Sequence, residues 1–332
     1  METMIAADTL GSIGESATLA RIFPRLPAAS SALLGPGDDA AVVSAPDGRF
    51  VVTTDMMIHG PDFRLAWSTA TDLGWKAAAS NLADVAAMGA VPSALVVAIA
   101  APINTPVALL EGIADGLREG CAALAPGCGV VGGDLSVSNT LTLAVTAFGD
   151  LEGRAPVLRS GARPGDLIAV AGVLGAASAG LKLLFAEGVV DGEPDAPAAA
   201  EVKRKHPELT SAQLAPAPPI AAGRLAALAG ATAMLDLSDG LALDARRIAV
   251  ASDVVIDLDS ALVGSREALD GGEDHSLLAA FPAGVSLPEG FRAIGTVVTA
   301  ATPHTARLLV DGQPYDALGG WDPYSGWNGE VG

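Results

Sequence analysis

Five short stretches of the sequence place acidic side chains beside glycine or hydroxyl residues, either at the end of an apolar strand or on the face of a helix. In chain order they read GPGDDAA, VVTTDMM, SNLADVAAMG, VVGGDLS and MLDLSDGL. A carboxylate is costly to bury without a partner, so a fold that contains these stretches must compensate their charge. Asp38 and Asp39 are adjacent with no basic residue nearby in the sequence, and they tolerate each other if a metal ion neutralises at least one of them.

Magnesium and phosphate are the ligands that this pattern favours. Mg²⁺ prefers carboxylate and hydroxyl oxygens and retains several of its waters. Phosphate groups bind the backbone N–H groups that glycine-lined turns expose. A single acidic turn would be an ordinary loop, but five of them in one chain indicate a shared site.

Hydrophobic periodicity predicts alternating strands and helices over the first 150 residues. The strands expected here cover residues 40–43, 50–54, 93–101 and 141–148, and the first two are joined by a hairpin turn at Asp47-Gly48. The helices cover residues 9–23, 69–88 and 107–124, and a threonine caps the second, which Gly89 closes. Asn81 and Asp84 share a face with the packed positions of that second helix, so they are either buried with partners or line a site.

A change of composition marks a domain junction. Residues 151–166 are rich in Arg, Gly and Pro, which is typical of a linker. We therefore predict two domains, residues 1–150 and 151–332. In the second, strands are expected at residues 166–172, 233–237 and 254–258, helices at 173–185 and 221–229, and Pro/Ala-rich loops around a short helix at 191–219. The glycine-punctuated turn at Gly172–Gly180 could receive an anion at the N-terminus of its helix.

Charge and hydropathy exclude several classes of partner. Lys and Arg number 19 against 38 Asp and Glu, a net charge of −19 at pH 7. Nucleic-acid backbones and anionic membranes are attracted by basic surfaces, so neither is an expected partner.

The longest apolar run, residues 94–102, is far shorter than the ~20 residues that cross a bilayer, and the first residues lack a signal-peptide pattern. The expected location is the cytoplasm, with Cys121 and Cys128 as buried thiols.

The common catalytic and nucleotide-binding motifs are missing. The chain contains no Gly-Lys pair and hence no Walker A loop, and it has no G-x-G-x-x-G after a strand, no H-E-x-x-H and no G-x-S-x-G. Its four histidines, His59, His206, His275 and His304, are scattered along the sequence. This argues against a mechanism centred on histidine or zinc.

Taken together, the motifs resemble the thiamine-monophosphate kinase family, which shares a superfamily with aminoimidazole ribonucleotide synthetase and selenophosphate synthetase. The matching stretches reach from about residue 11 to 324 and run in the order GPGDDAAV, TTDMMIHGPDF, KAAASNLADVAAMGA, VVGGDLS, LRSGARPGD, LDLSDGLALD, GGEDHSLL and GWDPY. The combination of NLADVAAMGA, VVGGD and DLSDGL indicates the superfamily, and GGED followed by GWD narrows the resemblance to the kinase.

The resemblance implies a function and a fold. It implies ATP-dependent phosphorylation of thiamine monophosphate to thiamine diphosphate, the last step of thiamine diphosphate biosynthesis, by Mg²⁺-assisted in-line transfer. The acceptor phosphate is already ionised at neutral pH, so no general base is needed. The implied fold is a two-domain α/β (α+β) synthetase-like fold, in which the N-terminal sheets of a homodimer form a β-barrel and the second half is an α/β domain.

The resemblance also implies site residues. The Mg²⁺ ligands it suggests are the hydroxyl and carboxyl residues Asp39, Thr53, Thr54, Asp55, Asp84, Asp134, Asp236 and Asp239. The ATP contacts it suggests are Gly133, Asp134, Arg159 and Ser238, with Arg159 a possible stabiliser of phosphate charge. The thiamine contacts it suggests are Asp62, Glu273 and Trp321, the last by stacking on an aromatic ring.

The chain departs from the family pattern in three places. Asp62 stands where His is common, His275 where Tyr is usual after GGED, and the tail reads WDPY rather than WDHF. These departures concern the substrate pocket more than the metal ligands. Three alternatives stay open: another ATP-using member of the superfamily such as aminoimidazole ribonucleotide synthetase, a non-catalytic nucleotide-binding dimer, and a Mg²⁺-dependent phosphatase.

Overall fold

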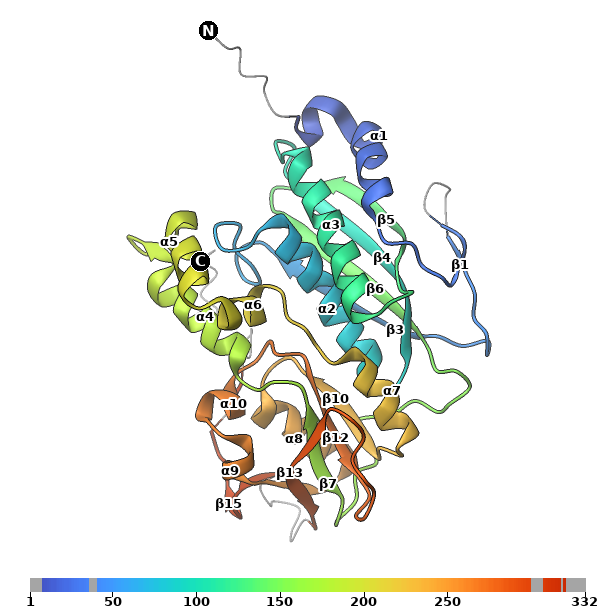
Figure 1. Cartoon of the computed structure of the whole chain (residues 1–332), viewed down its shortest axis with the longest axis vertical. Coiled ribbons are helices and arrows are strands. Elements are labelled where there is room, and N and C mark those ends of the chain that lie inside the picture. The colour runs from blue at the N-terminus through green and yellow to red at the C-terminus, as the bar shows by residue number, and fades with distance from the viewer. Residues whose placement is uncertain (1–7, 36–40, 300–306, 318, 321–332) are drawn as a thin grey trace.

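The structure is a computed structural model that describes residues 8–35, 41–299, 307–317 and 319–320. Figure 1 shows the first half of the chain, blue to green, above the large sheet of the second half, while the second-half helices between residues 176 and 214 lie beside the first half. Each half contains its own β-sheet and its own helices. The mixed α/β class with several sheets is thereby confirmed.

The first half is built around a four-stranded sheet with two long helices on one face (Figure 1). The strand order is β3-β6-β4-β5, in which β4 and β5 are parallel and the other neighbours antiparallel. The elements of this half are α1 (Leu10–Ile22), η1 (Phe23–Arg25), β1 (Ala32–Leu34), β2 (Val42–Val43), β3 (Val51–Ile58), α2 (Ala70–Ala87), β4 (Val91–Ala101), α3 (Val107–Leu124), β5 (Val130–Val137) and β6 (Thr142–Asp150).

The predicted hairpin at Asp47-Gly48 is wrong. Strand β2 pairs with β1, whereas β3 pairs with β6 from Val51 opposite Gly149 to Ile58 opposite Thr142. The reason is length: β2 offers only two residues to a partner, and β6 offers β3 a continuous ladder. The pairing with β6 therefore satisfies more backbone N–H and C=O groups than a local hairpin could.

Strand β5 was not predicted, because its centre reads Gly132-Gly133 and glycine disfavours strands. The structure shows why glycine stands there: a Cβ on Gly133 would lie 1.9 Å from the carbonyl oxygen of Val97 on the neighbouring strand β4. Glycine thus permits a close approach of the two backbones. Asp134 of VVGGDLS therefore lies within β5. Asp55 of VVTTDMM likewise lies within β3, rather than at the end of a strand as predicted.

The second half carries a seven-stranded, mostly antiparallel sheet of order β10-β12-β7-β13-β11-β14-β15. Its elements are β7 (Leu167–Ala171), α4 (Ala176–Glu187), β8 (Val189–Val190), β9 (Glu193–Pro194), α5 (Ala196–Lys205), α6 (Pro207–Leu214), α7 (Ile220–Leu228), β10 (Ala233–Leu237), α8 (Leu241–Ser252), β11 (Val255–Leu258), α9 (Ser260–Val263), α10 (Arg266–Asp270), β12 (Ser276–Phe281), β13 (Phe291–Val298), β14 (Leu308–Val310) and β15 (Gln313–Pro314).

The segment expected to be mostly loop contains two helices, α5 and α6. Proline suggested loops, but here Pro197 and Pro207 occupy the first turns of these helices. Proline is tolerated there because the N–H that it lacks has no intrahelical partner. Asp195 caps α5 by accepting a hydrogen bond from the N–H of Ala198 at 2.8 Å.

Helix α2 lies between the two halves and is buried almost all round, with 13 of its 18 residues buried. One apolar cluster includes its residues, the inner face of the first sheet, and Met234 and Phe281 from the second sheet. Two tryptophans donate hydrogen bonds to the second half: Trp67 Nε1 to the carbonyl of Gly188 at 2.8 Å, and Trp75 Nε1 to that of Pro216 at 2.7 Å.

Within the described residues, no helix is both long and apolar enough to cross a bilayer.

Glycines set the distance between α2 and α3. A Cβ on Gly116 of α3 would lie 2.1 Å from the carbonyl oxygen of Thr71, and one on Gly74 of α2 would lie 2.0 Å from that of Ile113. The helices therefore approach each other through bare backbone, in a protein whose aromatic content is only 4%. Small residues replace large side chains as the means of close packing here.

We predict that Gly116→Ala lowers the free energy of unfolding by about 2 kcal/mol, because the added methyl group overpacks the contact between α2 and α3. Gly120→Ala is the matched control on the same helix. Its Cβ would lie 3.4 Å from the nearest atom, an ordinary contact, so it should be neutral or stabilising by up to about 1 kcal/mol. Denaturant unfolding of both variants measures the difference, and equal stabilities would contradict this account of the packing.

Candidate functional site

The site begins on α2, which presents polar side chains toward strand β3. Lys76, Ser80 and Asp84 follow one another at a spacing of four residues and so lie on one face of the helix. Thr53 Oγ1 donates to Asp84 Oδ2 at 2.8 Å, and the backbone N–H of Asp55 donates to Asn81 Oδ1 at 3.1 Å. The acidic helix motif and the acidic strand motif of the first half thus contact each other directly.

The second half contributes two loops that are hydrogen-bonded to each other. The backbone N–H of Glu273 donates to the carbonyl of Ser238 at 2.7 Å, and that of His275 donates to Leu237 at 3.0 Å. His275 Nδ1 lies 3.3 Å from Asp236 Oδ2, and both side chains are buried. The DLSDG and GGED motifs, far apart in sequence, therefore form one structural unit.

Backbone conformation within the GGED loop is unusual. Glu273 and His275 both have positive φ angles, +71° and +50°, in the left-handed region that residues other than glycine rarely occupy. Such conformations persist only where the surrounding structure holds them and are common at functional sites. The turn directs the Glu273 side chain toward α2, where Lys76 Nζ lies 2.6 Å from Glu273 Oε2.

Carboxylates from both halves of the chain influence one another electrostatically. Burial, together with repulsion from Asp236 and Asp55, raises the pKa of Asp84 to about 7. Burial also raises the pKa of Asp55, and the charges of Asp236 and Glu273 add to this rise. Burial would lower the pKa of His275, but the hydrogen bond to Asp236 and the charge of Glu273 outweigh it and raise that pKa. The cluster has more negative charge than its own basic groups compensate.

Asp239 is held differently, by an internal network. Arg247 pairs with Asp239 Oδ2 and with Asp244 Oδ1, each at 2.5 Å. The buried Asp244 also accepts hydrogen bonds from the backbone N–H groups of Asp239 and Gly240, both at 3.1 Å. Burial raises the pKa of Asp244 to about 7 despite the charge of Arg247. Asp244 and Arg247 therefore fix the shape of the DLSDG loop.

The last acidic residue of GGED caps a helix. Asp274 accepts hydrogen bonds from the N–H groups of Gly175 at 2.5 Å and Ala177 at 2.9 Å, at the start of α4. The sequence suggested that this glycine-punctuated turn could receive an anion, and the anion that the structure places there is the protein's own carboxylate.

Several residues of the predicted site lie away from this cluster. The strand register aligns Asp134 with Ala98, Ala144 and Met56, on the face of the sheet that points away from α2. Thr54 lies on the same outer face, where its hydroxyl donates to the carbonyl of Val145 at 2.9 Å. Asp134 Oδ2 accepts a hydrogen bond from Ser136 Oγ at 2.6 Å and is exposed.

The other predicted residues are placed as follows. Gly133 lies in β5, between Gly132 and Asp134. Arg159 has an exposed side chain, and its carbonyl accepts a hydrogen bond from Ser252 Oγ at 3.1 Å. Asp39 and Trp321 lie outside the described residues. Among the residues that are described, no three His, Cys, Asp or Glu side chains form a group that could hold one metal ion.

Sequence reasoning assigned no role to Lys76, Asp244 or Arg247. A signal existed for Lys76, since it is a charged residue on the packed face of an otherwise apolar helix. Asp244 and Arg247 are three positions apart on α8, a common spacing for a helical ion pair. Their contacts with the DLSDG loop depend on its tertiary position and left no sequence pattern.

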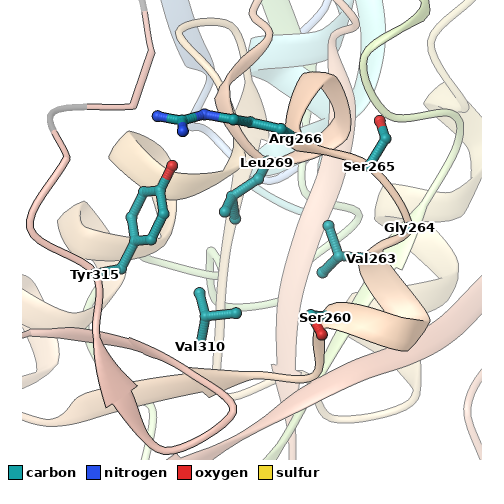
Figure 2. Close-up of a pocket in the computed structure, with 8 residues that line it drawn as sticks. All are labelled: Ser260, Val263, Gly264, Ser265, Arg266, Leu269, Val310 and Tyr315. Atoms are coloured by element: carbon teal, nitrogen blue, oxygen red, sulfur yellow. The ribbon is translucent and has the colours of Figure 1, made fainter.

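A separate cavity of about 250 Å³ lies between α9, α10, strand β14 and Tyr315. Figure 2 shows Val263, Leu269 and Val310 around its interior and the Tyr315 hydroxyl at one side. That hydroxyl donates to Asp270 Oδ1 at 2.6 Å. No residue of the predicted site lines this cavity, so we do not assign it to the phosphorylated substrates.

Comparison with known proteins relates this geometry to a family. Residues 37–151 match the family model described as AIR synthase related protein, N-terminal domain. Over 333 aligned residues, the chain is 44% identical to the thiamine-monophosphate kinase of Mycobacterium tuberculosis, covering 95% of this chain and 93% of that protein. This similarity extends far beyond the acidic motifs.

Solved structures agree with the sequence comparison. The crystal structure of thiamine monophosphate kinase from Aquifex aeolicus superposes with a TM-score of 0.69 at 29% identity, covering 82% of this chain and 90% of that one. A structure of AaThiL complexed with AMPPCP and TMP gives a TM-score of 0.70 at 31% identity, with coverages of 86% and 90%. The resemblance inferred from the motifs is confirmed, and the chain belongs to the thiamine-monophosphate kinase family.

Proposed function

We propose that the protein uses ATP to phosphorylate thiamine monophosphate, which gives thiamine diphosphate. Membership of the kinase family over nearly the full length of its relatives supports this function. So does the structure of AaThiL with AMPPCP, an ATP analogue, and TMP. The observation that carries the proposal is the convergence of motifs from both halves of the chain: Asp84 contacts Thr53 of β3, and Lys76 of the same helix pairs with Glu273, while the charges of Asp55 and Asp236 act on Asp84.

Magnesium fits the charge of this cluster. The pKa of Asp84 is raised to about 7 by burial and by repulsion from neighbouring carboxylates, so a divalent cation would relieve a repulsion that the described basic groups leave in place. Thr53, Asp55, Asp84 and Asp236 are the inner part of the proposed ligand set. We propose several Mg²⁺ ions rather than one, with Asp39, Thr54, Asp134 and Asp239 as the further ligands. Thr54 and Asp134 lie on the outer face of the sheet. When bound, Mg²⁺ would offset the repulsion between the two phosphorylated substrates and align their oxygens.

The protein's own residues position the two substrates. Gly133, Asp134, Arg159 and Ser238 are the proposed ATP contacts, and Arg159 has an exposed guanidinium group able to bind phosphate. Asp62, Glu273 and Trp321 are the proposed thiamine contacts. Because the acceptor phosphate is ionised at neutral pH, the side chains have to position and desolvate the substrates rather than remove a proton.

We also propose two domains, residues 1–150 and 151–332, and a homodimer in which two N-terminal sheets close into a barrel. Apolar side chains on the outer face and at the edge of the first sheet support this assembly. Val52 is 59% exposed, Met56 58% and Val137 64%. Such a face gains free energy by burial, and closure would pair the free edges of β3 and β5. The proposed location is the cytoplasm.

The purified protein should convert thiamine monophosphate to thiamine diphosphate in the presence of ATP and Mg²⁺, as measured directly by chromatography. A panel containing other phosphorylated acceptors and an ATP-free sample serves as the control. Turnover of another acceptor would indicate a different ATP-using member of the superfamily. Release of phosphate without ATP would indicate a phosphatase, and nucleotide binding without turnover would indicate a non-catalytic dimer.

Asp84→Asn should reduce turnover at saturating Mg²⁺ by at least about a hundredfold, the order of loss when one charge-stabilising group is removed. The fold should remain intact. Because the pKa of Asp84 is raised in the folded state to about 7, the metal-free wild type loses stability as pH rises from about 4 through about 7. The variant lacks this loss, so its metal-free melting temperature at pH 8 should exceed that of the wild type.

The control for this variant is Asp191→Asn, in an exposed turn where Asn also tolerates the positive φ of 53°. It should keep the activity and the Mg²⁺-dependent rise in melting temperature of the wild type. Normal activity of Asp84→Asn at saturating Mg²⁺ would show that Asp84 is not a metal ligand.

Met56→Glu should weaken the proposed dimer, because it places a charge on the apolar outer face of the sheet. We expect the dimer dissociation constant to rise at least about tenfold, which corresponds to 1.4 kcal/mol. Val250→Glu on α8 is the matched control, since Val250 is 62% exposed but lies outside that face. Sedimentation equilibrium measures both, and an unchanged dimer in Met56→Glu would contradict the barrel proposal.

A further inference from the structure

Lys76 is the one residue of α2 that brings a full positive charge into the described core. It is 6% exposed, and its Nζ lies 2.6 Å from Glu273 Oε2 and 3.1 Å from the carbonyl oxygen of Gln213 on α6. With the Gln213 amide turned so that its oxygen faces Lys76, that oxygen accepts a third hydrogen bond at 3.2 Å, and the amide nitrogen donates to the Ala177 carbonyl at 3.1 Å. All three donors of the ammonium group are then used.

A buried charge is retained only when its partners compensate the loss of water. Here the charge and its two partners come from three separate elements: Lys76 from α2 of the first half, Gln213 from α6, and Glu273 from the GGED loop. The cation is therefore placed where its position depends on the assembled fold. Apolar residues of similar length would fill the same space without this desolvation cost, so the charge calls for an explanation beyond packing.

The Glu273 side chain lies between Lys76 and solvent. The Glu273 side chain is 38% exposed, whereas the Lys76 side chain is 8% exposed. One carboxylate oxygen is held by the ammonium group, which leaves the other able to accept a hydrogen bond from outside. Burial raises the pKa of Asp62 most, the charge of Glu273 raises it further, and that of Lys76 lowers it. Asp62 Oδ2 accepts a hydrogen bond from the N–H of Ile58 at 2.7 Å. Lys76 thus lies behind Glu273, and the charges of both residues act on the carboxyl group of Asp62.

We propose that Lys76 is a positioning residue for the thiamine moiety of the substrate. It holds the Glu273 carboxylate in one orientation and offsets its charge, so that the free oxygen of Glu273 meets the cationic ring or the amino group of the substrate. This inference rests on the proposed function and on the placement of Asp62 and Glu273 in the thiamine pocket. It adds a residue that touches neither substrate and acts through Glu273.

The first test is Lys76→Met, assayed with thiamine monophosphate and ATP varied separately. The KM for thiamine monophosphate should rise at least about tenfold, the loss expected when one charge-assisted hydrogen bond no longer positions its acceptor. The KM for ATP and the Mg²⁺ dependence should change by less than about twofold, since a positioning role on the thiamine side does not reach them. A purely structural role would move both KM values together or lower the melting temperature alone.

The second test is the double-mutant cycle with Glu273→Gln. If Lys76 acts through Glu273, Lys76→Met should add less than about twofold to the KM for thiamine monophosphate in the Glu273→Gln background. The double variant also carries no unpaired buried charge, so it keeps the test available if Lys76→Met alone does not fold. Independent, multiplicative effects of the two substitutions would overturn the inference.

The matched control is Lys203→Met. Lys203 Nζ lies 3.7 Å from Asp72 Oδ2 and so also joins a second-half helix to α2, but its partner Asp72 lies one helical turn before Lys76. It should leave both KM values unchanged. A wild-type protein that forms no thiamine diphosphate would refute the proposed function itself, whereas an active wild type with no KM split in Lys76→Met would refute only the role of Lys76.

Discussion

Repulsion among aspartates is the constraint on which the candidate site depends. Asp55 and Asp84 come from the first half of the chain and Asp236 from the second, and together with burial their charges raise the pKa of Asp84 to about 7. Carboxylates held this way would separate if the elements carrying them could move apart. The apolar cluster around α2, which joins the inner face of the first sheet to Met234 and Phe281 of the second, holds them in place. Hydrophobic burial thus stabilises an arrangement that electrostatics opposes.

Neighbouring residues of the GGED loop contact different elements of the structure. Glu273 pairs with Lys76 of α2, Asp274 caps the first turn of α4, and His275 contacts Asp236. Three consecutive side chains therefore point to three different elements, which requires the positive φ angles at Glu273 and His275. The loop thus connects Glu273, a proposed thiamine contact, to Asp236, a proposed Mg²⁺ ligand. This is consistent with a reaction in which alignment and charge compensation replace proton transfer.

Prediction from sequence succeeded where a signal was local. The periodicity of residues 107–124 matches α3 residue for residue, and residues 233–237 match β10. It failed where a distant contact decided the structure. Strand β5 forms because Gly133 allows close approach to Val97, and α5 and α6 begin at prolines that composition suggested were loops. Among candidate site residues, the motifs indicated Asp55, Asp84 and Asp236, whereas Lys76, Asp244 and Arg247 have roles only in the assembled structure.

The sequence by itself determined the chemistry of the protein: acidic and hydroxyl residues in glycine-flanked motifs, their order along the chain, and hence its kinase family. Only the tertiary structure decided which of these groups meet. A period of two along each strand directs Thr53 and Asp55 toward α2 but Thr54 and Asp134 to the outer face of the sheet. Pairing partners far apart in the chain decide what faces each strand, because backbone hydrogen bonds and apolar burial are satisfied between elements rather than between neighbouring residues.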